Sequence, residues 1–324
     1  MRFRLRFFWL CGLLAVGGLI VAEIVLRVVV GLGTPPLFQV DETIEYLYQP
    51  SQNVKRFGNQ FYVNRYSMRA DEFSEVKEGA ELRVLCLGDS ILDGGALLDQ
   101  SELATVKLQE MLSADCAVPV VVGNASAKSW GPGNWLAYLQ RNGAFDADIV
   151  VIVISSHDLK DEPTFAPLNP NTHPTERPLS AFSEAFSRYL PRYLPFLASN
   201  APKDHGVELS DEELCAAAYA SLSSIIEWVD QQGAQVVVLS HVTRSELRAG
   251  EKKSGGLLIE GFMREQGVLL MDTLPFYEKA LMAERELYLD SIHLNAEGHA
   301  ALALALQAAV ASVANPESIQ GQLR

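Results

Sequence analysis

Cysteine and basic side chains are both scarce in this sequence. Its 324 residues include four cysteines, too few to frame a disulfide-stabilised mini-domain and too far apart for a zinc knuckle: Cys11, Cys86, Cys116 and Cys215. They are expected to be buried thiols, with a Cys116–Cys215 bridge left open. Lysine and arginine total 26 against 40 aspartate and glutamate, giving a net charge of −14. The chain therefore lacks the excess of cations that neutralises phosphates, and nucleic acid is not an expected partner.

Charged residues of either sign are also few: they make up 20% of the chain, and hydrophobic residues make up 48%. A disordered chain has few apolar residues, and a fibrous chain has a short repeat, so neither class fits this sequence. At about 150 residues per domain, the length leaves room for one or two domains with a large core. The composition is that of a globular protein.

The first 32 residues are a candidate membrane anchor. Residues 7–22 carry no charge, and apolar character resumes over residues 24–33, which makes the stretch long enough to span a bilayer. Three basic residues precede it: Arg2, Arg4 and Arg6. Asp41 and Glu42 follow it, so the positive-inside rule predicts a cytoplasmic N-terminus and an exported domain after about residue 33.

Glu23 and Arg27 are the two charges within this stretch. They are four residues apart and share one helix face, where they can pair and lessen the cost of charge near the interface. A cleaved secretory signal is the alternative, but no clear small-x-small site ends the run. We expect a retained single-pass anchor that contacts the membrane through residues 7–32.

Three parts follow the anchor. Residues 33–81 are expected to form an extended leader with short strands, for example at 60–63, and residues 315–324 a tail. Between them, apolar runs predict strands at 83–87, 118–122, 149–154, 235–239 and 268–271, and helical patterns occupy 97–112, 134–141, 210–232, 256–266 and 296–314. Strands with almost no polar residue are typical of a parallel sheet covered on both faces. We therefore expect residues 82–314 to form a doubly wound α/β domain with a five-stranded parallel sheet.

Residues 163–205 interrupt this alternation. Eight of the 15 prolines fall between residues 163 and 202, which argues against a regular core element and predicts an insertion over the sheet. His173 and His205 lie in this segment and are expected in exposed loops. Its aromatic residues either line a substrate groove or pack the insertion onto the sheet: Phe165, Phe182, Phe186, Tyr189, Tyr193 and Phe196.

Two short motifs can carry nucleophilic chemistry. Gly88-Asp89-Ser90 follows the first predicted strand of the sheet, and ligands bind beyond the carboxyl ends of parallel strands. There, the Ser90 N–H and the nearby helix N-terminus point at a developing oxyanion, although a serine at this position often serves only as a helix cap. Asp290 precedes His293 by three residues at a turn. Its carboxylate can hold one ring nitrogen of the histidine and leave the other to take a proton from serine.

Together these motifs resemble those of the SGNH subgroup of the GDSL-type serine esterases, over roughly residues 82–313. In that family a G-D-S block follows the first strand and a D-x-x-H block precedes the last helix. The resemblance implies a flavodoxin-like three-layer sandwich and acyl chemistry. It also implies that Ser90 attacks an ester carbonyl, that His293 acts as general base and then acid, and that Asp290 orients His293.

The two middle blocks depart from the family pattern. The second block usually supplies a glycine N–H to the oxyanion hole, and in the matching residues 123–131 either Ser129 or Gly131 takes that place. The third block is normally G-x-N-D, but residues 155–158 read Ser-Ser-His-Asp, so His157 replaces the amide. The expected donors are the Ser90 N–H, one of the two second-block N–H groups and the His157 ring. An inactive site is the alternative, because one missing donor costs about 2.7 to 4 kcal/mol.

The acidic residues beside the serine have a structural alternative. Asp89 and Asp93 flank Ser90 and look like the paired carboxylates of acid–base catalysis. A turn-stabilising Asp89 and a solvated Asp93 are favoured. We therefore assign neither residue a catalytic role.

Metal and cofactor sites are less well supported. Asp290, His293 and His299 match no common zinc motif. The glycines at 94–95 and 131–133 lack both the P-loop ending and the dinucleotide spacing. We expect no metal and no cofactor.

The leader adds a second resemblance. Residues 62–69, Tyr-Val-Asn-Arg-Tyr-Ser-Met-Arg, are similar to the V-N-x-x-G-x-R leader of anchored SGNH proteins that serve exopolysaccharide assembly, with Ser67 replacing glycine. This implies an exported esterase acting on O-acyl, most plausibly acetyl, groups of an envelope or secreted polysaccharide, with polysaccharide-assembly proteins as partners. An O-acetyltransferase uses the same acyl-serine and is the first alternative. A non-catalytic carbohydrate-binding or scaffold module is the second.

Overall fold

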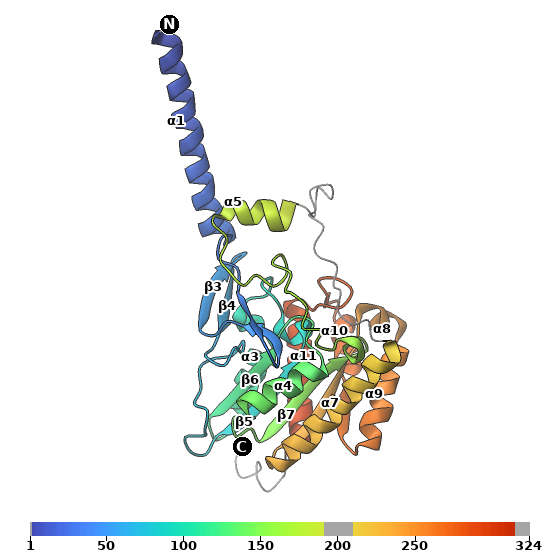
Figure 1. Cartoon of the computed structure of the whole chain (residues 1–324). Coiled ribbons are helices and arrows are strands. Elements are labelled where there is room, and N and C mark those ends of the chain that lie inside the picture. The colour runs from blue at the N-terminus through green and yellow to red at the C-terminus, as the bar shows by residue number, and fades with distance from the viewer. Residues whose placement is uncertain (1, 191–209, 315–324) are drawn as a thin grey trace.

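A five-stranded parallel sheet forms the centre of the protein (Figure 1). The computed structural model describes residues 2–190 and 210–314. The strands lie in the order β6 (Val120–Ser126), β5 (Leu82–Gly88), β7 (Ile149–Ser155), β8 (Gln235–His241) and β9 (Leu269–Asp272). This is a flavodoxin-like order, in which ligands bind at the carboxyl ends of the strands where the winding direction reverses, here β5 and β7.

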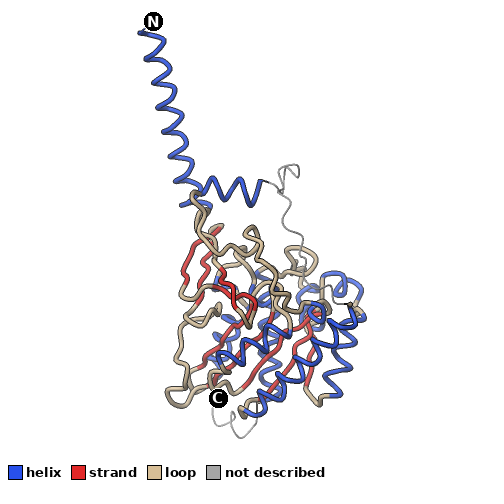
Figure 2. The backbone as a smooth tube through the Cα atoms, viewed as in Figure 1, coloured by secondary structure: helices blue, strands red, loops and turns tan. Residues whose placement is uncertain are grey.

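Helices cover both faces of the sheet (Figure 2). They are α3 (Ala104–Asp115), α4 (Pro132–Asn142), α7 (Asp211–Gln231), α9 (Ser254–Glu265), α10 (Leu274–Met282) and α11 (Ala296–Val313). Leu85 and Ile152 point into a core with α4, α7 and α9, whereas Val84 and Val151 point into a core with α3, α10 and α11. Successive strand residues face opposite sides, so each uninterrupted apolar strand fills both cores. The predicted doubly wound α/β sandwich is confirmed.

The helix after the serine motif begins later than the pattern predicts. The apolar spacing indicates a helix over residues 97–112, but α3 starts only after two separate turns, α2 (Ser90–Asp93) and the 3₁₀ turn Gln100–Glu102. Gly94 and Gly95 both adopt left-handed φ values, 70° and 62°. That conformation ends α2 and keeps the chain from continuing as one helix.

Smaller differences concern strand ends and short helices. β6 starts at Val120 rather than 118 and runs on to Ser126, and α8 (Arg244–Ala249) and α10 were not expected from the sequence pattern. All four cysteines are free, so Cys116 and Cys215 form no bridge. The predicted tail, residues 315–324, lies outside the described residues, and the domain boundaries predicted from the sequence remain predictions.

The leader forms two β-hairpins that belong to the core. They are β1 (Phe38–Asp41) with β2 (Glu45–Tyr48), and β3 (Gln52–Arg56) with β4 (Asn59–Val63). Phe38, Tyr48 and Phe61 are at most 1% exposed and join the core on the α4 side of the sheet. The leader is therefore folded as part of the domain rather than as a loose tether.

One apolar helix leads away from the domain at the N-terminus. It consists of α1 (Arg2–Val25) and a π-helical continuation, Leu26–Val30. Residues Arg6–Val30 are apolar enough to cross a membrane, and none of the tested window is buried in the protein. Helix α11 passes the same composition test but is half buried, as a core helix is. The predicted pair forms, with Arg27 Nε donating to Glu23 Oε1 at 2.6 Å.

The proline-rich insertion contains a helix that the sequence did not reveal. α5 (Ala181–Glu184) continues into a π-helical turn, Ala185–Tyr189, and lies crosswise near the end of α1 (Figure 1). Its Glu184 pairs with Arg56 of β3, both side chains being at most 3% exposed, and accepts from Gly33 N–H at 2.6 Å. Residues 191–209 of the insertion, with His205, Tyr193 and Phe196, lie outside the described residues.

Removing Glu184 is expected to destabilise the domain by about 3 to 5 kcal/mol, because Glu184→Ala leaves the Arg56 charge buried without its partner. Denaturant unfolding followed by tryptophan fluorescence measures the loss. Arg285→Ala is the matched control, since it breaks an ion pair with Glu297 in which both side chains are more than half exposed. That change should cost less than about 0.5 kcal/mol. Equal losses in the two variants would contradict the expectation.

Candidate active site

Ser90 lies directly beyond the carboxyl end of β5. Gly88 ends the strand, Asp89 caps α2 by accepting from Ile91 N–H at 2.8 Å, and Ser90 is the first helical residue. A side chain at Gly88 would place its Cβ 2.9 Å from Cβ of Leu92, so glycine is needed where strand and helix pack this closely. The turn therefore presents the Ser90 hydroxyl at the edge of the sheet.

His293 and Asp290 approach Ser90 from the loop before α11. His293 Nε2 lies 3.0 Å from Ser90 Oγ, and His293 Nδ1 lies 2.7 Å from Asp290 Oδ2. The Asp290 carboxylate also accepts from the backbone N–H groups of Ile292 and His293. Partial burial raises the pKa of Asp290, but these hydrogen bonds outweigh it and hold that pKa below its usual range. The structure thus brings together the three side chains that the sequence motifs singled out.

A cavity of about 770 Å³ opens at these three residues. The leader, the second block and the insertion all contribute to its wall. Aromatic and basic side chains dominate that wall away from the triad: Tyr48, Arg56, Phe57, Phe61, Lys128, Arg188 and Tyr189. The insertion therefore does line the groove, through Tyr189, as one of the two sequence-based interpretations proposed.

Asp93 is buried, which corrects the expectation that it is solvated. Its side chain is fully covered, yet it lines the same cavity as Ser90. Burial raises the pKa of Asp93, and the charges of Arg69 and Lys128 only partly offset this. The sequence carried no signal for this burial, because the groups that cover Asp93 come from the leader.

The leader motif is a turn that supports the nucleophile loop. Ser67 adopts a left-handed φ of 63°, the conformation that glycine, its counterpart in similar leaders, adopts without strain. The turn directs the buried Arg69 toward that loop, where its guanidinium donates to the carbonyls of Asp93 and Gly95 at 2.5 and 2.8 Å. Arg69 therefore ties the leader to the loop directly after the nucleophile turn.

The expected oxyanion donors separate into two groups. Ser90 and Ser129 both line the cavity, and Ser129 holds a left-handed φ of 56°. Gly131 and His157 are not among the residues that line it. Gly131 instead packs against another turn, where an added Cβ would lie 1.7 Å from the Asp161 carbonyl oxygen. Of the two second-block candidates, the geometry favours Ser129.

His157 is held within a cluster of carboxylates. Its Nδ1 contacts Ser155 Oγ at 2.5 Å, and its Nε2 lies 3.1 Å from Asp89 Oδ2 and 3.3 Å from Asp158 Oδ1. Burial opposes its charge, but the hydrogen bond to Asp89 and the nearby carboxylates outweigh burial and raise the pKa of His157 to about 9. Both ring nitrogens are therefore engaged away from the cavity, and His157 supports Asp89 and the nucleophile turn.

This cluster is also the group of described residues best spaced to hold a cation. Asp89, His157 and Asp158 each offer a ligand atom within 4.8 Å of the others. In the structure both ring nitrogens of His157 already have partners, Ser155 Oγ at Nδ1 and the two carboxylates at Nε2.

The charge on His157 is expected to make stability depend on pH. Because its pKa is raised from 6.5 in the unfolded chain to about 9, its stabilising contribution is complete below about pH 6.5 and is lost as the pH rises through about 9. His157→Asn should lower the Tm by about 2 to 4 °C near neutral pH, the shift that ~1 kcal/mol causes in a domain of this size. Thermal scans near pH 6.5 and near pH 10 test this, and the deficit should shrink at the higher pH. A deficit that grows with pH would count against the charged cluster.

His173 differs from the sequence-based expectation of an exposed loop histidine, whereas His299 lies in the last helix. His173 is partly buried, packs against the rings of Phe38 and Tyr46 and lines the Ser90 cavity, so it is not an exposed loop histidine. Burial lowers its pKa to about 4. His299 lies within α11, where its Nδ1 accepts from Ala104 N–H at 3.1 Å, away from the triad. The sequence missed the role of His173 because its ring partners come from the leader hairpin.

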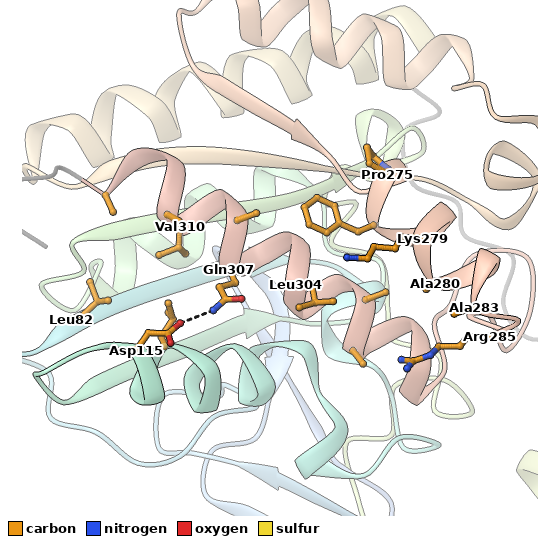
Figure 3. Close-up of a pocket in the computed structure, with 17 residues that line it drawn as sticks. Leu82, Asp115, Pro275, Lys279, Ala280, Ala283, Arg285, Leu304, Gln307 and Val310 are labelled. Carbon is orange, nitrogen blue, oxygen red and sulfur yellow. Dashed lines mark hydrogen bonds between the residues drawn. The ribbon is translucent and has the colours of Figure 1, made fainter. Parts of the chain in front are cut away.

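A second cavity, of about 810 Å³, lies between α3, α10 and α11 (Figure 3). Its wall is mainly alanine and leucine, with a hydrogen bond of 3.0 Å between Gln307 and Asp115 across it. Neither Ser90 nor His293 lines this cavity. The chemistry therefore belongs to the cavity at β5.

Comparison with known proteins shows the family of this chain. The profile of the GDSL-like lipase/acylhydrolase family matches residues 86–301, more than half of the chain. A search of curated proteins finds no match.

Several solved structures are similar to this chain. A catalytic mutant of an acetylxylan esterase from Geobacillus stearothermophilus has 18% identity and a TM-score of 0.45, covering 72% of this chain and 96% of that one. A lipolytic G-D-S-L family protein from Veillonella parvula has 10% identity and a TM-score of 0.43, with coverages of 72% and 98%. A lipase/acylhydrolase from Enterococcus faecalis has 14% identity and a TM-score of 0.42, with coverages of 71% and 96%.

Proposed function

Because this chain belongs to the GDSL-like lipase/acylhydrolase family of serine esterases, we propose that it is a membrane-anchored, exported esterase that removes small O-acyl groups from an envelope or secreted polysaccharide. The observation that carries the proposal is the contact of 3.0 Å between Ser90 Oγ and His293 Nε2 at a cavity large enough for sugar units. The anchor is the apolar helix Arg6–Val30, with its N-terminus in the cytoplasm.

In the proposed mechanism, His293 Nε2 takes the hydroxyl proton as Ser90 Oγ attacks the ester carbonyl. The N–H groups of Ser90 and Ser129 donate to the oxyanion. His293 then protonates the departing sugar alcohol, which leaves the acyl group on Ser90. Water, deprotonated by His293, attacks this acyl-serine, and the acid leaves as Ser90 regains its proton. Asp290 holds the His293 ring in the required tautomer throughout.

The side chains around the cavity support a small acyl group on a carbohydrate. Lys128, Asn171 and Thr172 line it without being buried, and a long alkyl chain placed against these polar side chains would remove their water without replacing its hydrogen bonds. Phe57 and Tyr189 offer aromatic surfaces against which the apolar face of a sugar ring can pack. The similarity of the leader to those of exopolysaccharide-associated proteins supports the same substrate class.

Exposure of the triad favours hydrolysis over acyl transfer. The side chains of Asp290 and His293 are 54% and 42% exposed, so water reaches the position next to the acyl-serine. A transferase has to exclude water from that position. The O-acetyltransferase and the non-catalytic scaffold are outcomes of the following test.

The purified full-length protein in detergent tests the proposal with p-nitrophenyl acetate, butyrate and octanoate, each with and without a polysaccharide acceptor. We expect turnover of the acetate without acceptor and a rate that falls as the acyl chain lengthens. Turnover that requires the acceptor and acetylates it would identify a transferase. Neither turnover nor labelling of Ser90 by a fluorophosphonate would identify a scaffold.

The oxyanion assignment has its own test at Ser129. Ser129→Gly keeps the N–H and suits the left-handed φ of 56°, so kcat should stay within about threefold of wild type, far from the 10²- to 10³-fold loss caused by removing a donor. Ser129→Val keeps the N–H but disfavours that conformation. It should lower kcat more than Ser129→Gly does. Equal kcat values in these two variants would argue against the Ser129 N–H as a donor.

A further inference from the structure

The helix of the insertion is attached to the membrane helix itself. Glu23 of α1 accepts from the backbone N–H groups of Ala181 and Phe182 at 2.8 and 3.1 Å, and Arg27 holds the same carboxylate. These two N–H groups are the first of α5 and lack partners within their own helix. The start of α5 is thereby fixed at the level of Glu23 on α1.

Glu23 lies near the outer boundary of the membrane if α1 spans it, as the proposed function requires. A hydrocarbon core of about 30 Å takes about 20 helical residues at 1.5 Å each. Counted from Phe7, the first residue after the N-terminal arginines, this length ends near Leu26. Glu23 and Arg27 lie on either side of that position, where charged side chains reach the headgroups. The first residues of α5, which donate to Glu23, therefore lie at the bilayer surface.

The two faces of this helix differ in character. Ala181 and Glu184 are buried against the domain, with Glu184 contacting Arg56 and Gly33. Phe186, two residues after Glu184 in the π-helical turn, is 63% exposed, whereas Glu184 is 3% exposed. Leu179, immediately before the N-cap of the helix, is 98% exposed. Two large apolar side chains are thus exposed on a segment that lies beside the end of α1, where that helix meets the domain (Figure 1).

We propose that the helix of residues 181–189 lies in the membrane interface, with its Phe186 and the preceding Leu179 inserted among the lipids of the membrane that holds α1. This proposal rests on the proposed membrane anchor. An amphipathic helix lies in the interface plane with its apolar side toward the acyl chains. The exposed apolar surface of residues 179 and 186 continues that of α1, where Val28 and Val29 are 74% and 68% exposed. The partner of this surface is therefore the lipid bilayer.

The position of this helix determines where the esterase meets its substrate. Arg188 and Tyr189, at its end, line the Ser90 cavity, as does Pro36, six residues after Val30, where the π-helical continuation of α1 ends. From Val30 to Pro36 the extended chain reaches at most about 20 Å. The cavity is thus held within that distance of the end of the spanning helix. It serves ester-bearing glycan at the membrane surface rather than polymer far from it.

Tryptophan fluorescence in vesicles tests this with the full-length protein. Phe186→Trp and, separately, Leu179→Trp are reconstituted in phosphatidylcholine vesicles with or without bromine at acyl carbons close to the headgroup. Leu258→Trp is the matched control, since Leu258 is 57% exposed on α9 of the domain. We expect the emission added at 186 and 179 to be largely quenched by the brominated lipid, and the emission added at 258 to be unquenched.

The native Trp9 of α1 separates the anchor from the interfacial helix. The lipid brominated close to the headgroup should also quench the Trp9 signal, defined as the difference between the protein and its Trp9→Phe variant, because Trp9 lies only about 3 Å along the helix from Phe7. If Trp9 is quenched but residues 179 and 186 behave like 258, the interfacial helix is wrong and the anchor stands. If Trp9 is not quenched, both proposals fail. Turnover of p-nitrophenyl acetate is unaffected by either outcome and reports on the esterase alone.

Discussion

Replacing Ser90 by alanine is expected to lower ester turnover by about 10⁵- to 10⁶-fold, the loss seen when a serine nucleophile is removed from a catalytic triad. Without its hydroxyl the protein forms no acyl intermediate, although the cavity and the His293–Asp290 pair remain. The readouts are the release of p-nitrophenol from the acetate ester and labelling by a fluorophosphonate. Circular dichroism should show an unchanged fold, because Ser90 Oγ contacts only His293 among the described residues.

The chain provides an unusual control for this experiment. Ser155, His157 and Asp89 form a second serine–histidine–aspartate set, with Ser155 Oγ 2.5 Å from the histidine ring. Ser155 is fully buried, so no ester can reach it. Ser155→Ala should therefore keep fluorophosphonate labelling that Ser90→Ala loses. Labelling that disappears with Ser155 and persists without Ser90 would overturn the assignment of the nucleophile.

Replacing His293 by alanine is expected to cost as much as the loss of Ser90, about 10⁵- to 10⁶-fold in kcat. The serine needs a base within hydrogen-bond reach, and among the described residues only His293 contacts its hydroxyl. The double variant Ser90→Ala/His293→Ala should be no slower than either single variant, because the two groups act as one unit. Measuring kcat for all three proteins tests this. Losses that multiply in the double variant would indicate independent roles.

Asp290 should matter less than its two partners. Asp290→Asn removes the charge that orients His293, a change worth about 10⁴-fold where the pair is buried. Here the Asp290 side chain is 54% exposed, so water partly replaces it and the loss should be smaller, about 10² to 10³-fold. The measurement is kcat of Asp290→Asn compared with kcat of His293→Ala. A smaller loss in Asp290→Asn indicates a carboxylate that orients His293, and an equal loss would indicate a second base.

The cavity is built from parts of the chain that lie far apart in the sequence. Ser90 comes from the sheet, Asp290 and His293 come from the loop before α11, and Tyr189 comes from the insertion. The leader hairpins cover the remaining side and bury Asp93. Specificity can therefore vary with the leader and insertion while the sheet and the triad stay as they are.

Much of the fold could be read from local patterns. Uninterrupted apolar runs marked all five strands of the sheet, since a strand buried on both faces has no polar position. The capping box at Ser210 marked the start of α7, because Ser210 and Glu213 satisfy each other's free backbone groups locally. The motifs around Ser90 and His293 named side chains that the structure places in contact. These features depend on neighbours in the sequence or on one regular topology.

Other features could be decided only by the tertiary structure. The sequence alone determined the strands, the apolar N-terminal helix and the three residues Ser90, Asp290 and His293. It did not determine that Asp93 is buried or that His157 contacts Asp89. Nor did it determine that the first N–H group of α5 donates to Glu23. The physical reason is that burial, pKa and charge pairing depend on groups that come from residues far away along the chain. No local sequence pattern indicates which distant groups will lie next to a given side chain.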